Sequence, residues 1–208
     1  MKVRVGPKAI LVITYAVGVV GIAWPTSRAL TLALTPVHLL LSAALVLRAA
    51  QPRLHTWWPW ALSVVALGYG LELVGVHTGL PFGWYDYGAA LGPKFWAVPP
   101  VIGVNWLLLV LAGAEVARRL ARHRALQILL GAALMVALDA LIEPLAPRLG
   151  FWQFWGGVAP PQNYLGWLAA SLAFQWGHAR YVPSYRNPLA LWLVGLMSAF
   201  FVLLRVWV

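Results

Sequence analysis

Three of the five acidic residues in this 208-residue chain lie inside long apolar segments, near the segment ends. These are Glu72, Asp139 and Glu143. A carboxyl group at such a position costs about 2.5–3.5 kcal/mol even on the lenient insertion scale. We therefore expect all three to face the interior of a helix bundle and to act in catalysis.

Asp139 and Glu143 are four residues apart, which places both on one face of a helix. Two carboxyl groups so close in a medium of low dielectric should not both ionise, so one of them is expected to stay protonated at neutral pH. The pair could then donate a proton. The alternative is a neutral polar pair that only braces two helices.

The other two acids have weaker assignments. Asp86 lies between Tyr85 and Tyr87, and it could be a fourth catalytic group or the partner of Lys94 in a loop ion pair. Glu115 precedes a pair of arginines by one helical turn and is expected to form a local ion pair.

Residues 77–97 combine glycine and proline with aromatic residues, a composition that the interior of a helix does not tolerate. We expect an ordered aromatic loop that folds back over the acids. Aromatic faces stabilise a developing cation by about 0.5–2 kcal/mol each. The chain has 13 tryptophans, more than interfacial belts need, and Trp57, Trp58, Trp60 and Trp207 are assigned to belts. Six others are expected around the acids: Trp84, Trp96, Trp106, Trp152, Trp155 and Trp167.

A site made of acids and aromatic rings, without metal ligands, predicts a reaction that proceeds through a carbocation on a lipid substrate. Two amides, Asn105 and Asn163, each follow a Pro-Pro pair and could hold a water molecule or orient a carboxyl group. The candidate substrate-binding residues are Thr78, Phe82, Trp84, Tyr85, Tyr87, Trp96, Asn105, Trp106, Trp152, Asn163 and Trp167.

Several other classes of chemistry lack their sequence signals. The chain has no cysteine, and its five histidines show no pair at the spacing of metal ligands, which disfavours a di-iron oxygenase. It contains no phosphate-binding glycine loop and no aspartate-rich diphosphate motif. The net charge of +10 is scattered over the ends of apolar runs, so we expect lipid headgroups, and no nucleic acid, as its partner.

The elements that position these residues are predicted to be membrane helices. The chain is 62% hydrophobic and 10% charged, with a mean hydropathy of +0.79. This composition indicates an all-α, polytopic transmembrane bundle, a single domain over residues 1–208. The first apolar run lacks a signal-peptide cleavage site and is taken as a span. The seven predicted spans are 8–24, 29–48, 57–76, 98–120, 124–144, 163–179 and 188–207.

Lys and Arg are distributed unevenly between the two sides of this topology. The positive-inside rule places the N-terminus in the cytoplasm and the C-terminus outside, in the cell (inner) membrane. The loops 77–97 and 145–162 then share the outer side.

These two outer loops and their flanking spans resemble each other. Adding 67 to Glu72 gives Asp139, and adding 67 to Gly83 gives Gly150. Adding 61 to Trp106 gives Trp167, each following a Pro-Pro pair. We hypothesise a parallel repeat of spans three and four in spans five and six. A pseudo-two-fold axis along the membrane normal would bring Glu72 opposite Asp139.

The motifs over residues 57–180 resemble the CruF-type carotenoid hydratase family, which includes bisanhydrobacterioruberin hydratase and the gamma-carotene or lycopene end-group hydratases. The most specific block is Thr78-Gly79-Leu80-Pro81-Phe82-Gly83, followed by Asp139, Glu143-Pro144, Gly150-Phe151-Trp152 and Pro161-Gln162-Asn163. The resemblance implies addition of water to the terminal double bond of an acyclic carotenoid, without a cofactor. Its partners would be a long-chain carotenoid, water, membrane lipid and other enzymes of pigment synthesis.

Within that expected reaction, we assign Glu72 and Asp139 as the acid and base pair, with Glu143 tuning Asp139. Two other readings stay open. One is a membrane-integral lycopene cyclase, in which a neighbouring double bond captures the cation. The other is a non-enzymatic carotenoid carrier or a small proton-coupled transporter.

Overall fold

The computed structural model describes residues 6–207, and these fold into helices with one small sheet. The helices are α1 (Pro7–Ala23), α2 (Pro25–Ala33), α3 (Thr35–Ala49), a short 3-10 turn (Leu54–Thr56), α4 (Trp58–Thr78), α5 (Val101–Leu120), α6 (Arg124–Ile142), α7 (Pro161–Tyr181) and α8 (Pro188–Trp207). The strands are β1 (Tyr85–Tyr87) and β2 (Trp152–Phe154). The predicted all-α bundle is confirmed.

All seven predicted spans are helical, but the second is not one straight helix. It is divided at Leu34 into α2 and α3, whose axes differ by 55°. Pro36, in the first turn of α3, has no N–H to bond the preceding turn, so a continuous helix would be interrupted there. Pro25 separates α1 from α2 in the same way.

Four helices are long and apolar enough to cross a membrane: α4, α5, α6 and α8. The bent pair α2 and α3 makes a fifth candidate span, and α1 is a shorter apolar helix of 17 residues. The seventh predicted segment forms the 21-residue helix α7 but does not meet the same test. It carries buried Asn163, Gln175 and His178, which lower its apolar character.

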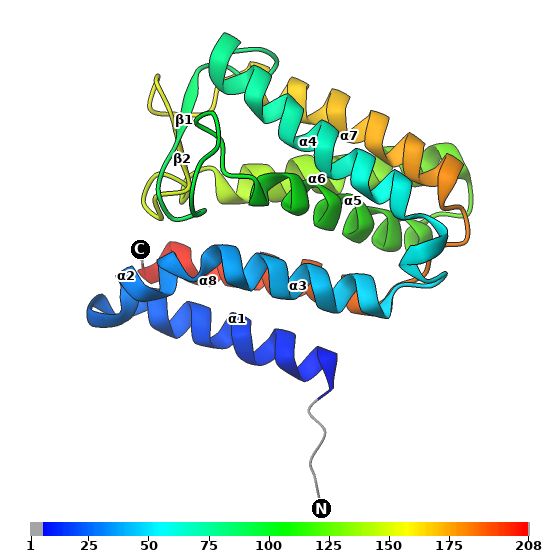
Figure 1. Cartoon of the computed structure of the whole chain (residues 1–208), viewed down its shortest axis with the longest axis horizontal. Helices are drawn as coiled ribbons and strands as arrows, with labels where there is room; N and C mark the ends of the chain where they lie inside the picture. The colour runs from blue at the N-terminus through cyan, green and yellow to red at the C-terminus, as the bar shows by residue number, and fades with distance from the viewer. Residues whose placement is uncertain (1–5, 208) are drawn as a thin grey trace, which may run out of the picture.

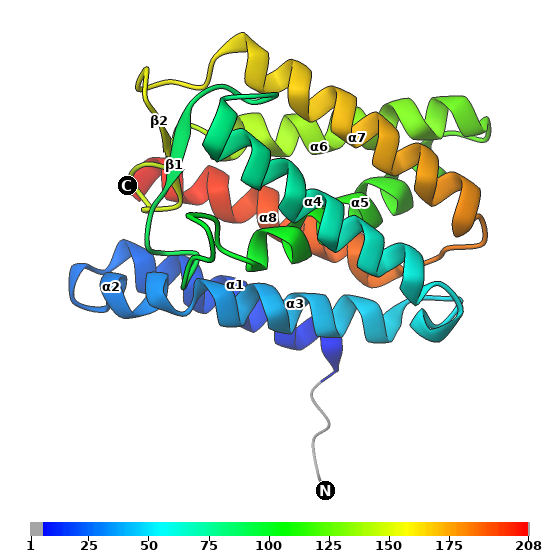
Figure 2. The same cartoon turned by 45° about the horizontal axis from the view of Figure 1, so that its top comes forward.

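Helix α5 lies at the centre of the structure and is buried along most of its length. It contacts α4, α6 and α7 on one side and α3 and α8 on the other. Helices α1, α3 and α8 pack along one side of the group formed by α4, α5, α6 and α7 (Figures 1 and 2). Both strands lie at one end of this bundle, and the turn between α5 and α6 lies at the other (Figure 1).

The predicted aromatic loop is ordered, and it carries a short strand that the sequence did not indicate. β1 pairs with β2 in an antiparallel sheet that joins the loops 77–97 and 145–162. The register sets Asp86 opposite Gln153, which is 67 residues later. Tyr85 then pairs with Phe154 and Tyr87 with Trp152, a symmetric arrangement about that central pair. This register is the one that the hypothesised repeat would produce.

A second contact between the two segments of the hypothesised repeat lies deeper in the bundle. Trp106 of α5 and Trp167 of α7 occupy equivalent positions and stack with their ring centroids 4.1 Å apart and their planes at 15°. Gly83 and Gly150, also equivalent, both adopt positive φ (98° and 66°), a conformation that glycine allows without strain. These local likenesses are in line with the hypothesised repeat, which stays a prediction.

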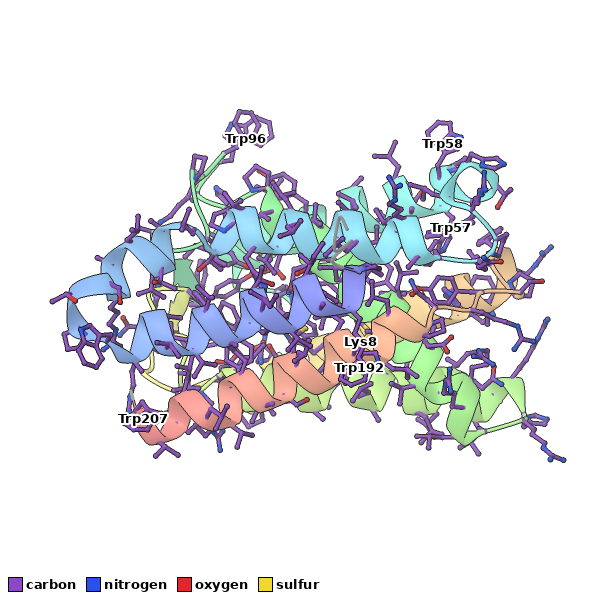
Figure 3. The ribbon with its side chains drawn as sticks, turned by 90° about the horizontal axis from the view of Figure 1, so that it is seen from below. Lys8, Trp57, Trp58, Trp96, Trp192 and Trp207 are labelled. Atoms are coloured by element: carbon purple, nitrogen blue, oxygen red, sulfur yellow. The ribbon has the colours of Figure 1, made fainter. Side chains whose placement is uncertain are left out.

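The outer tryptophans lie near both ends of the bundle (Figure 3). Trp58 is 54% exposed and Trp207 is 65% exposed, as expected for interfacial belts. Trp57, assigned to the same belt, is instead buried, and its Nε1 donates to the carbonyl of Pro52 at 2.8 Å. Lys8 lies 3.6 Å from the ring centre of Trp192 (Figure 3).

Candidate active site

Glu72 is buried near the C-terminal end of α4 and accepts three hydrogen bonds. The hydroxyls of Tyr85 and Tyr87 donate to its Oε2 at 2.5 and 2.7 Å. The indole Nε1 of Trp106 donates to its Oε1 at 2.8 Å. Because an indole N–H can only donate, Oε1 is fixed as an acceptor. Three donors directed at one carboxyl group favour its charged form.

Strand alternation explains how both tyrosines reach one carboxyl group. In β1, Tyr85 and Tyr87 point to the buried face, whereas Asp86 points to the exposed face. Asp86 accepts a hydrogen bond from Trp155 Nε1 at 2.6 Å, on the outside of the sheet. Lys94, its expected partner, donates to the carbonyl oxygen of Tyr87. Asp86 is thus placed away from the other three acids.

Asp139 and Glu143 form a second acidic group, linked by one amide. Asn163 Nδ2, near the start of α7, lies 2.8 Å from Asp139 Oδ2 and 3.4 Å from Glu143 Oε1. Trp152 Nε1 of β2 donates to Glu143 Oε1 at 3.1 Å. Because both carboxyl groups bond the same amide, a change in the charge of one alters the protonation equilibrium of the other.

Glu72 and Asp139 line the same small cavity, which has a volume of about 30 Å³ and is called the chamber below. This is room for one or two water molecules. Oδ1 of Asp139 is buried and has no hydrogen-bond partner among residues 6–207. A buried carboxyl oxygen without a partner is costly unless a water or substrate atom meets it. The other walls of this chamber are Phe82, Tyr85, Tyr87, Ile102, Asn105, Leu109, Ile142, Trp152, Phe154, Asn163 and Trp167.

Tyr85, Tyr87 and Glu143, at the strand end of the bundle, have shifted protonation equilibria. Burial raises the pKa values of Tyr85 and Tyr87, and the negative charge of Glu72 raises them further, so both hydroxyls stay protonated as donors. Burial raises the pKa of Glu143 to about 7, although the hydrogen bond from Trp152 acts in the opposite direction. Glu143 therefore changes charge close to neutral pH.

A larger cavity of about 310 Å³ adjoins the chamber and is lined almost entirely by apolar side chains. The two spaces share Ile102, Asn105, Ile142 and Trp152, which form the junction between them. The other walls of the larger cavity come mainly from α1, α3 and α8. Val17 of α1 and Val37 of α3 are 62% and 60% exposed, so the cavity opens on the surface between these helices.

The walls of this apolar cavity are the part of the site that the sequence did not indicate. In the sequence, the segments that form α1, α3 and α8 are recognisable only as apolar runs. They lie outside residues 57–180, which carry the motif resemblance. His38, from α3, also lines the cavity, and its buried Nε2 has no partner within the part of the chain that the structure describes.

Most of the predicted site residues meet at the chamber, but some do not. The structure brings together Glu72, Phe82, Tyr85, Tyr87, Asn105, Trp106, Asp139, Glu143, Trp152, Asn163 and Trp167. It places three predicted binding residues elsewhere. Thr78 is exposed and bonds the backbone of its own turn, at Val74 and Leu80. Trp84 and Trp96 are 46% and 68% exposed and stack on Trp155 and Phe95.

The space that admits the Tyr85 hydroxyl is left by a glycine. A Cβ atom at Gly75, one turn after Glu72, would lie 2.6 Å from the Tyr85 hydroxyl oxygen and 3.0 Å from Phe82. We expect Gly75→Ala to displace Tyr85, to lower stability by about 1–3 kcal/mol, and to reduce activity at least about tenfold.

Gly70→Ala, on the same helix, is the matched control because a Cβ there meets nothing within 4 Å. It should leave activity unchanged and stabilise α4 by up to about 1 kcal/mol. Thermal unfolding and product formation, measured for both variants, check this. Equal behaviour of the two variants would contradict the role given to Gly75.

No group of three or more His, Asp or Glu side chains that could hold a metal ion occurs within residues 6–207. The functional side chains of the chamber are carboxyl, phenol, amide and indole groups, which can transfer protons, hold water and face a cation.

Comparison with known proteins places this geometry in context. The sequence profile of a protein family, described as carotenoid biosynthesis protein, matches residues 34–208 of this chain. This range includes helices α3 to α8. A curated protein, bisanhydrobacterioruberin hydratase from Haloarcula japonica, is 36% identical over 141 residues, covering 57% of this chain and 46% of that protein. The chain thus matches about half the length of this relative. No solved structure gives a significant match.

Proposed function

The chain belongs to the carotenoid biosynthesis protein family, and from this premise we propose that it is a hydratase that adds water to the terminal double bond of an acyclic carotenoid end group. The observation that carries the proposal is the shared chamber: Glu72 and Asp139 line one small cavity that adjoins a larger apolar one. The name of the 36% identical relative supports the same reaction class.

The protein is integral to the membrane, since its helices are apolar over lengths that cross a bilayer. The apolar cavity opens between α1 and α3, on a surface of exposed aliphatic side chains. In the proposed binding mode the polyene enters from the lipid through this opening. Its reactive end then lies at the junction formed by Ile102 and Ile142, where it faces the chamber. We further propose that the strands and the chamber lie on the outer side, because the arginine-rich turn between α5 and α6 is at the other end.

Asp139 is the proton donor in the proposed mechanism. Its Oδ2 is engaged by Asn163, while Oδ1 is buried without a partner among the described residues and belongs to a wall of the chamber. A proton on Oδ1 is free to move to the terminal carbon of the double bond. The electron pair of that bond forms the new C–H bond, and a tertiary cation remains on the adjacent carbon.

Glu72 balances this cation and completes the addition. Its carboxylate, held by Tyr85, Tyr87 and Trp106, is a fixed negative charge in a buried site. The stacked rings of Trp106 and Trp167 supply further stabilisation. A water molecule in the chamber forms the C–O bond, and its proton passes to Glu72. Return of one proton to Asp139 restores the enzyme, so the sum is one water added to one double bond.

The reaction is tested with the purified protein, lycopene or gamma-carotene, and water enriched in heavy oxygen. We expect a product heavier by one labelled water, with the label in a tertiary alcohol. An unlabelled cyclised product would instead identify a cyclase, and an unchanged pigment that stays bound would identify a carrier.

The protonation of Glu143 predicts the pH dependence of the reaction. With burial raising its pKa to about 7, Glu143 is mostly neutral at lower pH and mostly charged at higher pH. A negative charge linked to Asp139 through Asn163 opposes loss of the Asp139 proton. Activity should therefore fall as pH rises through about 7, by up to about tenfold over two pH units.

The Glu143→Gln variant tests this explanation, because its side chain cannot titrate. Its initial rates between about pH 6 and pH 8 should be nearly constant. A transition of the same size in wild type and variant would assign the titration to another group.

A further inference from the structure

A third cavity lies at the end of the bundle opposite the strands, and neither the reaction nor the family description gives it a role. Its volume is about 280 Å³. It is formed by the turn between α5 and α6, the last turn of α7 and the segment that leads into α8. Four arginines line it: Arg118, Arg122, Arg124 and Arg186.

The positive charge of this cavity is only partly compensated. Glu115, buried beneath it, pairs with Arg118 at 2.7 Å and with Arg119 at 3.0 Å. No carboxylate lines the cavity, and Arg122, Arg124 and Arg186 form no ion pair within residues 6–207. Three cations around one concave space repel one another unless a counter-ion lies between them.

His178 gives a second, independent indication of a ligand. It lies on α7 in the wall of the cavity and is only 7% exposed. Its Nε2 has no hydrogen-bond partner among the described residues. Trp60 and Tyr185 contact the ring edge-on, at centroid distances of 5.3 and 5.0 Å, and hold it in place. A buried ring nitrogen that lacks a partner in the protein needs one in the cavity.

We propose that this cavity binds a phosphate-bearing anion through Arg122, Arg124, Arg186 and His178. Guanidinium groups bind phosphate oxygens by paired N–H donors, and the imidazole adds one donor from the floor of the site. The anion is either the headgroup of an acidic phospholipid or free inorganic phosphate. The position, at the end of transmembrane helices and rich in arginine, is where lipid headgroups lie.

The two sources are distinguished by two binding measurements on the full-length protein. In one, the thermal unfolding midpoint is compared in nanodiscs of phosphatidylcholine alone and with added phosphatidylglycerol. In the other, inorganic phosphate is titrated into detergent-solubilised protein at constant ionic strength. A bound ligand should raise the midpoint by about 3–6 °C at concentrations well above Kd. The arm that responds identifies the source.

The Arg122→Gln, Arg124→Gln, Arg186→Gln triple variant should lose this increase. The matched control is the triple variant Arg48→Gln, Arg53→Gln, Arg180→Gln, which removes the same charge at the same end of the bundle at positions that do not line the cavity. If the first triple variant does not fold, the single variants Arg122→Gln and Arg186→Gln are used, each expected to weaken binding about threefold to tenfold.

No response to either probe would overturn the proposal. An equal loss in the control variant would also overturn it, because the attraction would then belong to the whole basic surface.

Discussion

Asp139→Asn is expected to abolish product formation, lowering the rate by about 10²–10⁴-fold. Asn163 can still donate to the remaining side-chain oxygen, so the near-isosteric change keeps the packing of α6 against α7. What it removes is the acidic proton that would face the double bond from Oδ1. Product is measured by mass after incubation with lycopene in labelled water.

The matched control is Asp86→Asn, which makes the same change of chemistry on the exposed face of β1. Asp86 accepts from Trp155 outside the chamber, so its amide variant should keep nearly full activity. Both variants should unfold at temperatures close to that of the wild type. An active Asp139→Asn protein, or an inactive Asp86→Asn protein that still folds, would contradict the assignment of the donor.

Glu72→Gln is expected to lower the rate by about 10²–10³-fold while leaving the pigment bound. The three donors around Glu72 can be accommodated, because the amide oxygen can accept from Trp106 and the tyrosine hydroxyls can turn to accept from the amide nitrogen. The fold therefore tolerates the change. The negative charge that balances the cation, and the base that takes the proton from water, are both lost.

Tyr87→Phe separates the charge of Glu72 from its hydrogen bonds. This variant removes one donor to Oε2 and keeps the carboxylate, so we expect a loss of only about tenfold. Pigment that co-purifies with each variant is quantified by absorbance. If Glu72→Gln released the pigment, Glu72 would be a binding group, and if it formed product at the wild-type rate, the proposed base would be wrong.

The sequence by itself determined the chemical inventory of this protein. The three acids near the ends of apolar segments, the tyrosines flanking Asp86 and the two asparagines after Pro-Pro pairs were all identifiable from residue type and position. A carboxyl group in an apolar helix without a basic partner nearby is so unfavourable that its presence indicates a function. The helices follow from the same local physics, because apolar segments of spanning length leave their backbone groups no other partner than themselves.

The spacing of the repeat also carried three-dimensional information. An offset of 67 residues relates Glu72 to Asp139, and the structure places both on the wall of one chamber. The spacing did not show that the loops 77–97 and 145–162 form a sheet. Three-residue strands leave too short a pattern of alternation to be recognised, and their pairing depends on a partner about 67 residues away.

Only the tertiary structure decided which aromatic residues serve the acids. Trp84, Trp96, Trp106, Trp152 and Trp167 are alike in the sequence, yet the first two lie on the surface and the other three line or border the chamber. The structure also decided that α1, α3 and α8, which the sequence shows only as apolar helices, form most of the walls of the larger apolar cavity. The reason is physical. Composition and periodicity show how a segment interacts with its solvent. A cavity instead depends on which surfaces of distant segments meet, and on where their side chains leave the space between them unfilled.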